Sequence, residues 1–133
     1  MAAEQIALTK VQEQLRIRGF SPTCMVRNCP NGDIHARKGR CLVRFEVKGM
    51  DQRNGVWLKK RQINAVHIVV IYVVRGDEVW VLSPAEAHRL LDEYQRDFVA
   101  RNGRAPAAEG FNKSQFPKPT GWGPLDKLLP ADC

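Results

Sequence analysis

The segment Phe45-Glu46-Val47-Lys48-Gly49 carries the residue types best suited to chemistry in this chain. A carboxylate and a lysine separated by a single apolar residue project from the same face of a β-strand. The carboxylate can hold a metal ion, and the ammonium group can orient a water molecule beside it. An isolated Glu-x-Lys also arises by chance on half-solvated strands, so the interpretation depends on the surrounding elements.

The strand itself is predicted from alternation. Residues 41–48 alternate between apolar and polar side chains, which indicates one buried and one polar face. The apolar face consists of Cys41, Val43, Phe45 and Val47, and the polar face of Arg44, Glu46 and Lys48. The polar face is either an open site or solvent.

A second carboxylate is expected near Glu46. Residues 30–33 are turn formers that lead into a short strand over 33–36, and Lys38-Gly39 can close a two-residue hairpin loop. In that register Asp33 pairs with Arg44 and lies diagonal to Glu46 on the polar face. Diagonal neighbours are roughly 7–8 Å apart, so the two carboxylates can converge on one cation.

These residues together resemble a known superfamily. The order of a helix, Gly19-Phe20, Gly32-Asp33-Ile34 and Phe45-Glu46-Val47-Lys48-Gly49 is similar to that of the PD-(D/E)XK nucleases over roughly residues 4–92. This superfamily has the restriction-endonuclease-like fold and includes archaeal Holliday junction resolvases. The chain departs from its pattern at Gly32, which stands where proline is common, and Pro30 lies three positions upstream of Asp33.

The resemblance implies a metal site and a catalytic lysine. An acidic residue that begins the second strand, the motif carboxylate and the carbonyl between carboxylate and lysine would bind Mg²⁺ or Mn²⁺. By position these are Asp33, Glu46 and the main-chain carbonyl of Val47, and Lys48 would assist the attacking water.

Glu4 is a possible further ligand. Leu8, Val11 and Leu15 give residues 4–18 a helical apolar stripe, and Glu4 falls on that stripe. It either favours the helix dipole in the first turn or reaches the edge of the metal site, and the resemblance favours the second interpretation.

Residues 57–64 are expected to form a short basic helix or helical turn. By resemblance, Gln62 and Lys59 would contact the site or the phosphate. Trp57 is open to two interpretations, stacking on a base or a core or lid role, and the core or lid role is preferred.

The remaining elements complete an α/β fold. Residues 66–74 are almost continuously β-branched and predict a central strand buried on both faces, with His67 as a packed or edge residue. Residues 78–82 form the next strand, and Ser83-Pro84-Ala85-Glu86 starts a helix that reaches about Val99. The expected fold for residues 1–102 is a restriction-endonuclease-like mixed central sheet flanked by helices.

Residues 103–133 are rich in glycine and proline and are expected to form an extended arm. Phe111, Phe116, Trp122 and three leucines make this arm too apolar for a free linker. It is expected to pack on the body or on a partner subunit. A homodimer is slightly favoured, since two sites related by a two-fold axis could address both strands of a duplex.

The charge of the chain favours a polyanionic partner. The net charge is +7, with 44% hydrophobic residues in 133, which suits one well-packed basic domain. Basic residues recur around the carboxylates and are candidates for phosphate contacts. They are Arg37, Lys38, Arg40, Arg44, Lys59, Lys60 and Arg61.

No segment suggests a membrane span or a secretion signal, so a cytoplasmic location is expected. In that compartment a disulfide framework is not expected from the four cysteines. A zinc site from Cys24, Cys29, His35 and Cys41 can be drawn, but its spacing is irregular and Cys41 suits the core face.

The sequence therefore predicts a metal-dependent nuclease that hydrolyses phosphodiester bonds, with DNA preferred over RNA as substrate. One alternative is a catalytically silent nuclease-like module that binds nucleic acid or protein. Another is a subunit whose arm serves assembly.

Overall fold

The computed structural model of the chain describes residues 2–26 and 29–132. Its main helices are α1 (Ala3–Ile17), α2 (Lys60–Asn64), α3 (Pro84–Asn102) and α4 (Leu125–Leu128), with a 3₁₀ turn η1 at Lys113–Gln115. The strands are β1 (Ser21–Cys24), β2 (Ile34–Lys38), β3 (Cys41–Met50), β4 (Val56–Trp57), β5 (Ile68–Val73), β6 (Glu78–Leu82) and β7 (Gly110–Phe111).

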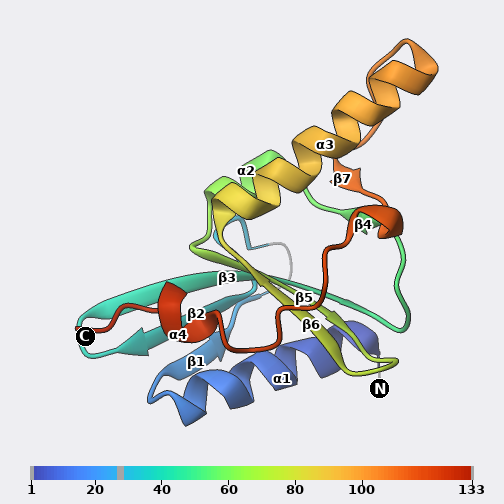
Figure 1. Cartoon of the computed structure of the whole chain (residues 1–133). Coiled ribbons are helices and arrows are strands. Elements are labelled where there is room, and N and C mark those ends of the chain that lie inside the picture. Colours follow the sequence, from blue (N-terminus) through green and yellow to red (C-terminus); the bar gives the residue numbers. More distant parts are fainter. Residues whose placement is uncertain (1, 27–28, 133) are drawn as a thin grey trace.

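Five strands form a mixed sheet in the order β1-β2-β3-β5-β6. The pair β3 and β5 is parallel, and the other neighbours are antiparallel. Helix α1 covers one face, and α2 and α3 lie on the other, with the C-terminal part of α3 extending beyond the sheet (Figure 1). The expected mixed α/β fold with a central sheet flanked by helices is thereby confirmed.

Strand β3 faces both layers, as its alternation predicts. Val43, Phe45 and Val47 are buried with Ala7, Val11 and Leu15 of α1, and β5 is buried along its whole length. The predicted start of α3 is also confirmed: Ser83 Oγ accepts from the Glu86 amide, and Glu86 Oε1 accepts from the Ser83 amide.

Three local predictions were wrong. The β2-β3 hairpin turns at Gly39-Arg40, and Lys38 pairs with Cys41. This register is shifted by two residues from the expected one, and because the shift is even, every side chain keeps its predicted face. The helix expected over residues 57–64 begins only at Lys60, since Trp57 belongs to β4, which pairs with residues 110–111 far along the chain. Strand β1 was not predicted.

The arm packs on its own domain. The ring centroids of Trp80 and Phe116 lie 4.6 Å apart with their planes tilted, and the indole donates through Nε1 to the Pro117 carbonyl. The Thr120 amide donates to the Val79 carbonyl, and the Val81 amide donates to Thr120 Oγ1, so the arm covers the outer edge of β6. The apolar residues of the arm are thus buried or partly buried on the chain's own body, and a homodimer through the arm stays a prediction.

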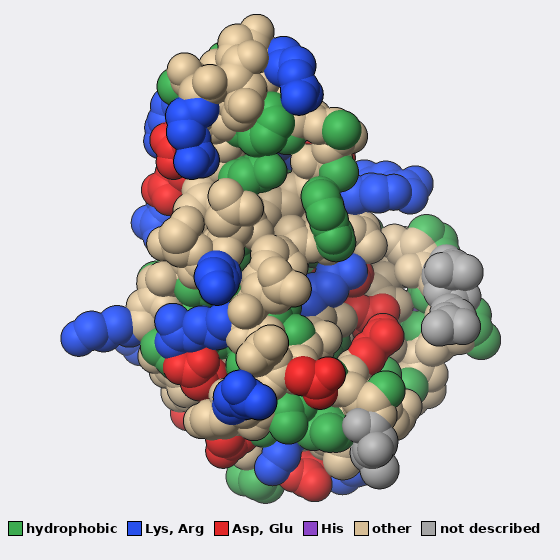
Figure 2. All heavy atoms as spheres, turned by 90° about the vertical axis from the view of Figure 1, so that its right-hand side faces the viewer, with side chains coloured by type: hydrophobic (Ala, Val, Ile, Leu, Met, Phe, Trp, Pro, Cys, Tyr) green, Lys and Arg blue, Asp and Glu red, His purple; other side chains and the backbone are tan. Residues whose placement is uncertain are grey.

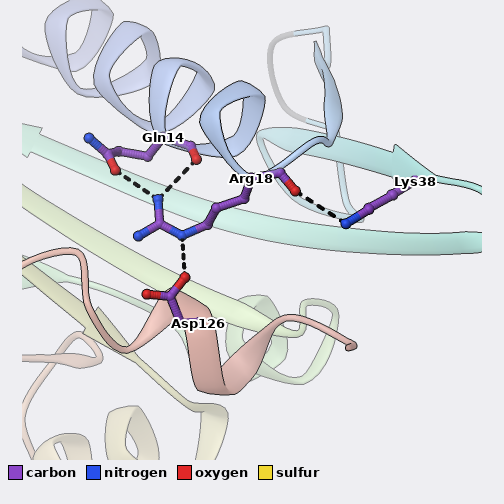
Figure 3. A network of polar contacts seen from close by, with 4 residues as sticks. All are labelled: Gln14, Arg18, Lys38 and Asp126. Atoms are coloured by element: carbon purple, nitrogen blue, oxygen red, sulfur yellow. Dashed lines mark hydrogen bonds and ion pairs between the residues drawn. The ribbon is translucent and has the colours of Figure 1, made fainter. Parts of the chain in front are cut away.

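The end of the arm is fixed to α1 by an ion pair. Arg18 Nε lies 2.7 Å from Asp126 Oδ1 in α4, while Arg18 Nη1 donates to the carbonyl and the side-chain oxygen of Gln14 (Figure 3). Lys38 Nζ contacts the Arg18 carbonyl oxygen at 3.4 Å and lies over the Phe20 ring. Helix α4 therefore closes the α1 side of the sheet.

Cys41 is disulfide-bonded, although a disulfide framework was not expected. The zinc site that the irregular spacing already argued against lacks this ligand, because a disulfide sulfur is not a thiolate. In the described ranges Cys24 and Cys29 are free thiols, and no helix there is long and apolar enough to cross a bilayer.

The close approach of α1 to β3 depends on Gly49. A Cβ atom at this position would lie 2.5 Å from the Ala3 carbonyl oxygen and 2.8 Å from the Ala7 Cβ. The glycine of the Glu-Val-Lys-Gly segment thus allows the first turn of α1 to cross directly over the end of β3.

We expect Gly49→Ala to destabilise the protein by about 1–3 kcal/mol, because backbone and helix must move apart to accept one methyl group. Thermal denaturation of both proteins checks this. Gly123→Ala is the matched control, since nothing lies within 4 Å of a Cβ there. Equal melting temperatures for Gly49→Ala and wild type would show that α1 does not pack this closely.

Candidate active site

The site lies where β2 leaves β3. Ile34 and Phe45 are the last paired residues of these strands, and beyond Phe45 strand β3 pairs only with β5. Asp33 stands at this fork: its amide donates to the Phe45 carbonyl, and its Oδ2 accepts from the Val47 amide at 2.7 Å. The Asp33 side chain thus supplies the bond that the missing strand would have made, which fixes the carboxylate beside Glu46.

Gly32 makes this position of Asp33 possible. Its φ is +104°, and a Cβ atom there would lie 2.7 Å from the Phe45 carbonyl oxygen and 2.9 Å from Val66 Cγ1. Proline, whose ring fixes φ near −65°, could not adopt this conformation. The glycine is therefore required both by the backbone angle and by the space.

Glu46 is a buried carboxylate, with 6% of the residue exposed. Burial, the nearby negative charge of Asp33 and a direct hydrogen bond with Asp33 raise the pKa of Glu46 to about 7, against an opposing effect of Lys48. The two carboxyl groups are therefore within hydrogen-bonding reach of each other. Lys48 Nζ lies 3.5 Å from Glu46 Oε2, and 29% of its side chain is exposed.

These groups open into a cavity of about 480 Å³, here called the carboxylate cavity. Asp33, Glu46 and Lys48 line it together with Glu4 from α1 and Gln62 from α2. Five residues that the sequence analysis assigns to the site thus line one cavity. Gln62 also accepts from the Lys59 amide through Oε1 at the start of α2.

The donor set suits a hard divalent cation. Two carboxylates in contact repel each other when both are ionised, and a cation between them removes that repulsion. Nevertheless, residues 2–26 and 29–132 contain no cluster of three His, Cys, Asp or Glu side chains arranged to hold a metal. Glu4 is exposed at the mouth, so any ion here would rest on Asp33, Glu46 and main-chain or water oxygens.

The basic residues divide into two groups. One group lies near the fork or at α2 and consists of Arg44, Lys59, Lys60 and Arg61. The other lies at the β2-β3 hairpin turn and consists of Arg37, Lys38 and Arg40. The hairpin end is roughly 20 Å along β3 from Glu46, at about 3.3 Å per residue. Lys38 is on the α1 face, held at Arg18, so it is not gathered at the site. Lys60 pairs with Asp92 at 3.5 Å.

His67 extends the β3-β5 pairing at this end of the sheet. Its amide donates to the Arg44 carbonyl, and its Nδ1 accepts from the Arg44 amide at 2.9 Å. Burial and the charge of Arg44 lower the pKa of His67, which suits an imidazole that accepts a hydrogen bond. His67 is exposed just before β5 and holds the Arg44 backbone, so of the two expected roles it has the edge role and not the packed one.

Sequence reasoning missed a second hollow beside the first. A cleft of about 510 Å³ is lined by Trp57, Lys59 and residues 106–109, and it shares Lys48 and Gln62 with the carboxylate cavity. Trp57 is 69% exposed, so of the preferred core or lid role the core role was wrong, and the lid role stays a prediction. Val56 is buried and Trp57 is exposed, as alternation along a strand predicts, but two residues are too few to indicate a strand from the sequence.

This face of the molecule combines both charges. Figure 2 shows acidic side chains next to lysine and arginine side chains on it, below the projecting upper part of the structure. Acidic and basic groups thus lie side by side on this face of the molecule.

This chain is similar to the solved structure of a bacterial homing endonuclease, I-Ssp6803I. The TM-score is 0.50 with 16% sequence identity, over 64% of this chain and 68% of that chain. No protein-family model matches the sequence, and no curated protein does. The chain thus has a nuclease-like α/β fold, established by structure and not by sequence identity.

The raised pKa of Glu46 predicts a pH-dependent stability in metal-free solution. A carboxyl with a pKa of about 7 when folded and about 4.5 when unfolded costs no stability below pH 4.5. As the pH rises from 4.5 to 7, the unfolded state ionises first and the folded state loses stability. Glu46→Gln removes this loss and should gain on the order of 2 kcal/mol relative to wild type between pH 5 and pH 8.

Denaturation midpoints of both proteins with a chelator at pH 5 and pH 8 measure the effect. Glu13→Gln, at an exposed position on α1, is the control for the same chemical change. An equal difference between wild type and Glu46→Gln at the two pH values would contradict the buried, carboxylate-paired environment of Glu46.

Proposed function

We propose that the protein is a metal-dependent nuclease that hydrolyses phosphodiester bonds in nucleic acid, with DNA as the favoured substrate. The observation that carries the proposal is that Asp33, Glu46 and Lys48 line one open cavity, with Lys48 Nζ 3.5 Å from Glu46 Oε2. Few structural roles need a buried and a half-buried carboxyl group side by side with a partly exposed lysine.

The sequence pattern supports this proposal independently. Asp33, Glu46, the Val47 carbonyl and Lys48 match the order of the PD-(D/E)XK motif, and the chain departs from it at Gly32. That departure has a local cause, because the left-handed backbone at Gly32 excludes proline. Glu4 and Gln62 line the same cavity, which is where the resemblance places their counterparts.

Asp33 and Glu46 would hold Mg²⁺ or Mn²⁺, which supplies an acidic water and neutralises charge on the phosphate. The Val47 carbonyl would be a further ligand, since its amide is already fixed by Asp33. Lys48 would orient the attacking water and stabilise negative charge that develops on the phosphate oxygens. Its distance of 3.5 Å from Glu46 leaves its ammonium free to turn into the cavity.

The charge of the chain supports a nucleic-acid substrate. A net charge of +7 attracts a polyanion, and Lys59 and Arg61 are exposed beside the carboxylate cavity. Similarity in fold to a homing endonuclease adds support for DNA over RNA. A chain that binds nucleic acid without cutting is the alternative, and cleavage assays separate the two.

We expect Glu46→Gln to abolish divalent-ion-dependent cleavage of DNA, because the amide cannot replace the carboxylate at the ion. Lys48→Ala should lower turnover by roughly 100-fold or more while metal binding is largely retained, since lysine acts on water and phosphate. Cleavage of linear, branched and single-stranded DNA and of RNA is measured with Mg²⁺, and Mn²⁺ binding by calorimetry.

Glu13→Gln and Lys127→Ala carry the same chemical changes at exposed positions and should cleave like wild type. Full activity of Glu46→Gln would refute the assigned site. Tight binding of nucleic acid without cleavage by wild type at any divalent ion would favour the catalytically silent module.

Salt dependence tests the phosphate contacts. We expect Lys59→Ala to weaken DNA binding and to lower the slope of log affinity against log salt by about one unit, because one phosphate contact is lost. Lys60→Ala is the neighbouring control and should change less, since Lys60 is paired with Asp92. Equal effects of the two substitutions on affinity and on the salt slope would contradict a specific phosphate contact at Lys59.

A further inference from the structure

Trp57 is an exposed aromatic residue that the proposed chemistry does not use. It has 69% of its surface exposed, although its strand neighbour Val56 is buried. In the described ranges no other ring stacks on it and no cation lies over it. A bare indole at the wall of a cleft is a surface for a planar partner.

The face of the indole is kept clear by its cross-strand partner. Trp57 pairs with Gly110 between β4 and β7, and glycine has no side chain to cover it. Any larger residue at Gly110 would collide with the Val56 carbonyl oxygen. The close packing of β4 against β7 therefore requires glycine at position 110, and the absence of a side chain there leaves the indole uncovered.

The walls of this tryptophan cleft are fixed before any ligand binds. The Leu58 amide donates to the Glu109 carbonyl at 3.1 Å, and the Lys60 amide donates to Glu109 Oε2 at 3.1 Å. Glu109, the one acidic residue in the lining, is thus held by the first turn of α2. Lys48 and Lys59 leave the cleft with an excess of positive charge.

The cleft is continuous with the carboxylate cavity, because Lys48 and Gln62 line both. Its volume of about 510 Å³ falls within the usual range for small-molecule sites. A ligand that spans the two hollows would place a phosphate near Lys48 and a planar group against Trp57. A nucleotide carries both parts, a phosphate and a planar base.

We propose that the tryptophan cleft receives an unstacked nucleobase of the substrate strand, next to the phosphate that is cleaved. This inference rests on the proposed nuclease function and adds the class of substrate. In an intact duplex each base is covered by its neighbours, so only an unpaired or extruded base can reach the indole. The preferred substrates are accordingly single-stranded, bulged or branched DNA.

The test measures binding of the full chain with a chelator present, so that cleavage does not interfere. The probes are fluorescein-labelled DNAs of one sequence: a paired duplex, the duplex with one bulged nucleotide, the same bulge with an abasic residue, and the single strand. We expect wild type to bind the bulged and single-stranded probes more tightly than the duplex and the abasic bulge.

Trp57→Ala should weaken binding of the bulged and single-stranded probes by roughly 10- to 100-fold, because stacking on one base is lost. Trp57→Phe should retain most of the affinity, since a ring remains. Ile17→Ala is the matched control, as it truncates an equally exposed apolar residue on the far end of α1. Tryptophan emission should fall on binding in wild type and much less in Trp57→Phe, because Trp80 is buried and Trp122 is half-buried against Tyr72.

The outcomes separate this inference from the function on which it rests. Wild-type binding of all probes with equal strength, or unchanged affinity of Trp57→Ala, would overturn the base site and leave the nuclease proposal standing. Absence of binding to every probe at low salt would overturn both. Loss of affinity in Trp57→Ala for the bulge, with none for its abasic form, is the result that establishes the base site.

Discussion

The hydrogen bond from the Val47 amide to Asp33 Oδ2 is the interaction on which the site depends. At this point β3 loses its neighbour β2 and would expose a free strand edge. A buried amide without an acceptor is costly, and the carboxylate satisfies it. The same bond brings Asp33 against Glu46. One interaction thus completes the backbone pairing and concentrates negative charge.

The surrounding structure supports that fork from both sides. Gly32 gives the backbone its left-handed turn below Asp33, and Gly49 lets α1 cross the end of β3 closely enough for Glu4 to reach the cavity. Above the sheet, α2 contributes Gln62. Two glycines therefore set the distances between three elements, and neither could be replaced by a residue with a side chain without moving a wall of the site.

Much of this was accessible from the sequence, for physical reasons. Alternation in β3 fixes which side chains share a face, and the capping residues at Ser83 and Glu86 fix the start of α3. The hairpin register was two residues off because Gly39-Arg40 and Lys38-Gly39 are both acceptable turns, yet parity preserved the placement of Asp33. The tryptophan cleft could not be foreseen, because β4 exists only through pairing with β7, more than fifty residues later.

Residues 106–117 are synthesised after the strands of the sheet, so they dock on the domain late in translation. The carboxylate residues are made early, but one wall of the tryptophan cleft belongs to the segment after α3, and that segment is anchored by Phe116 and Pro117 on Trp80. A nascent chain in which only the sheet has formed therefore lacks the side of the tryptophan cleft that residues 106–109 line. The tryptophan cleft is thus complete only after residues 106–117 have left the ribosome and docked on Trp80.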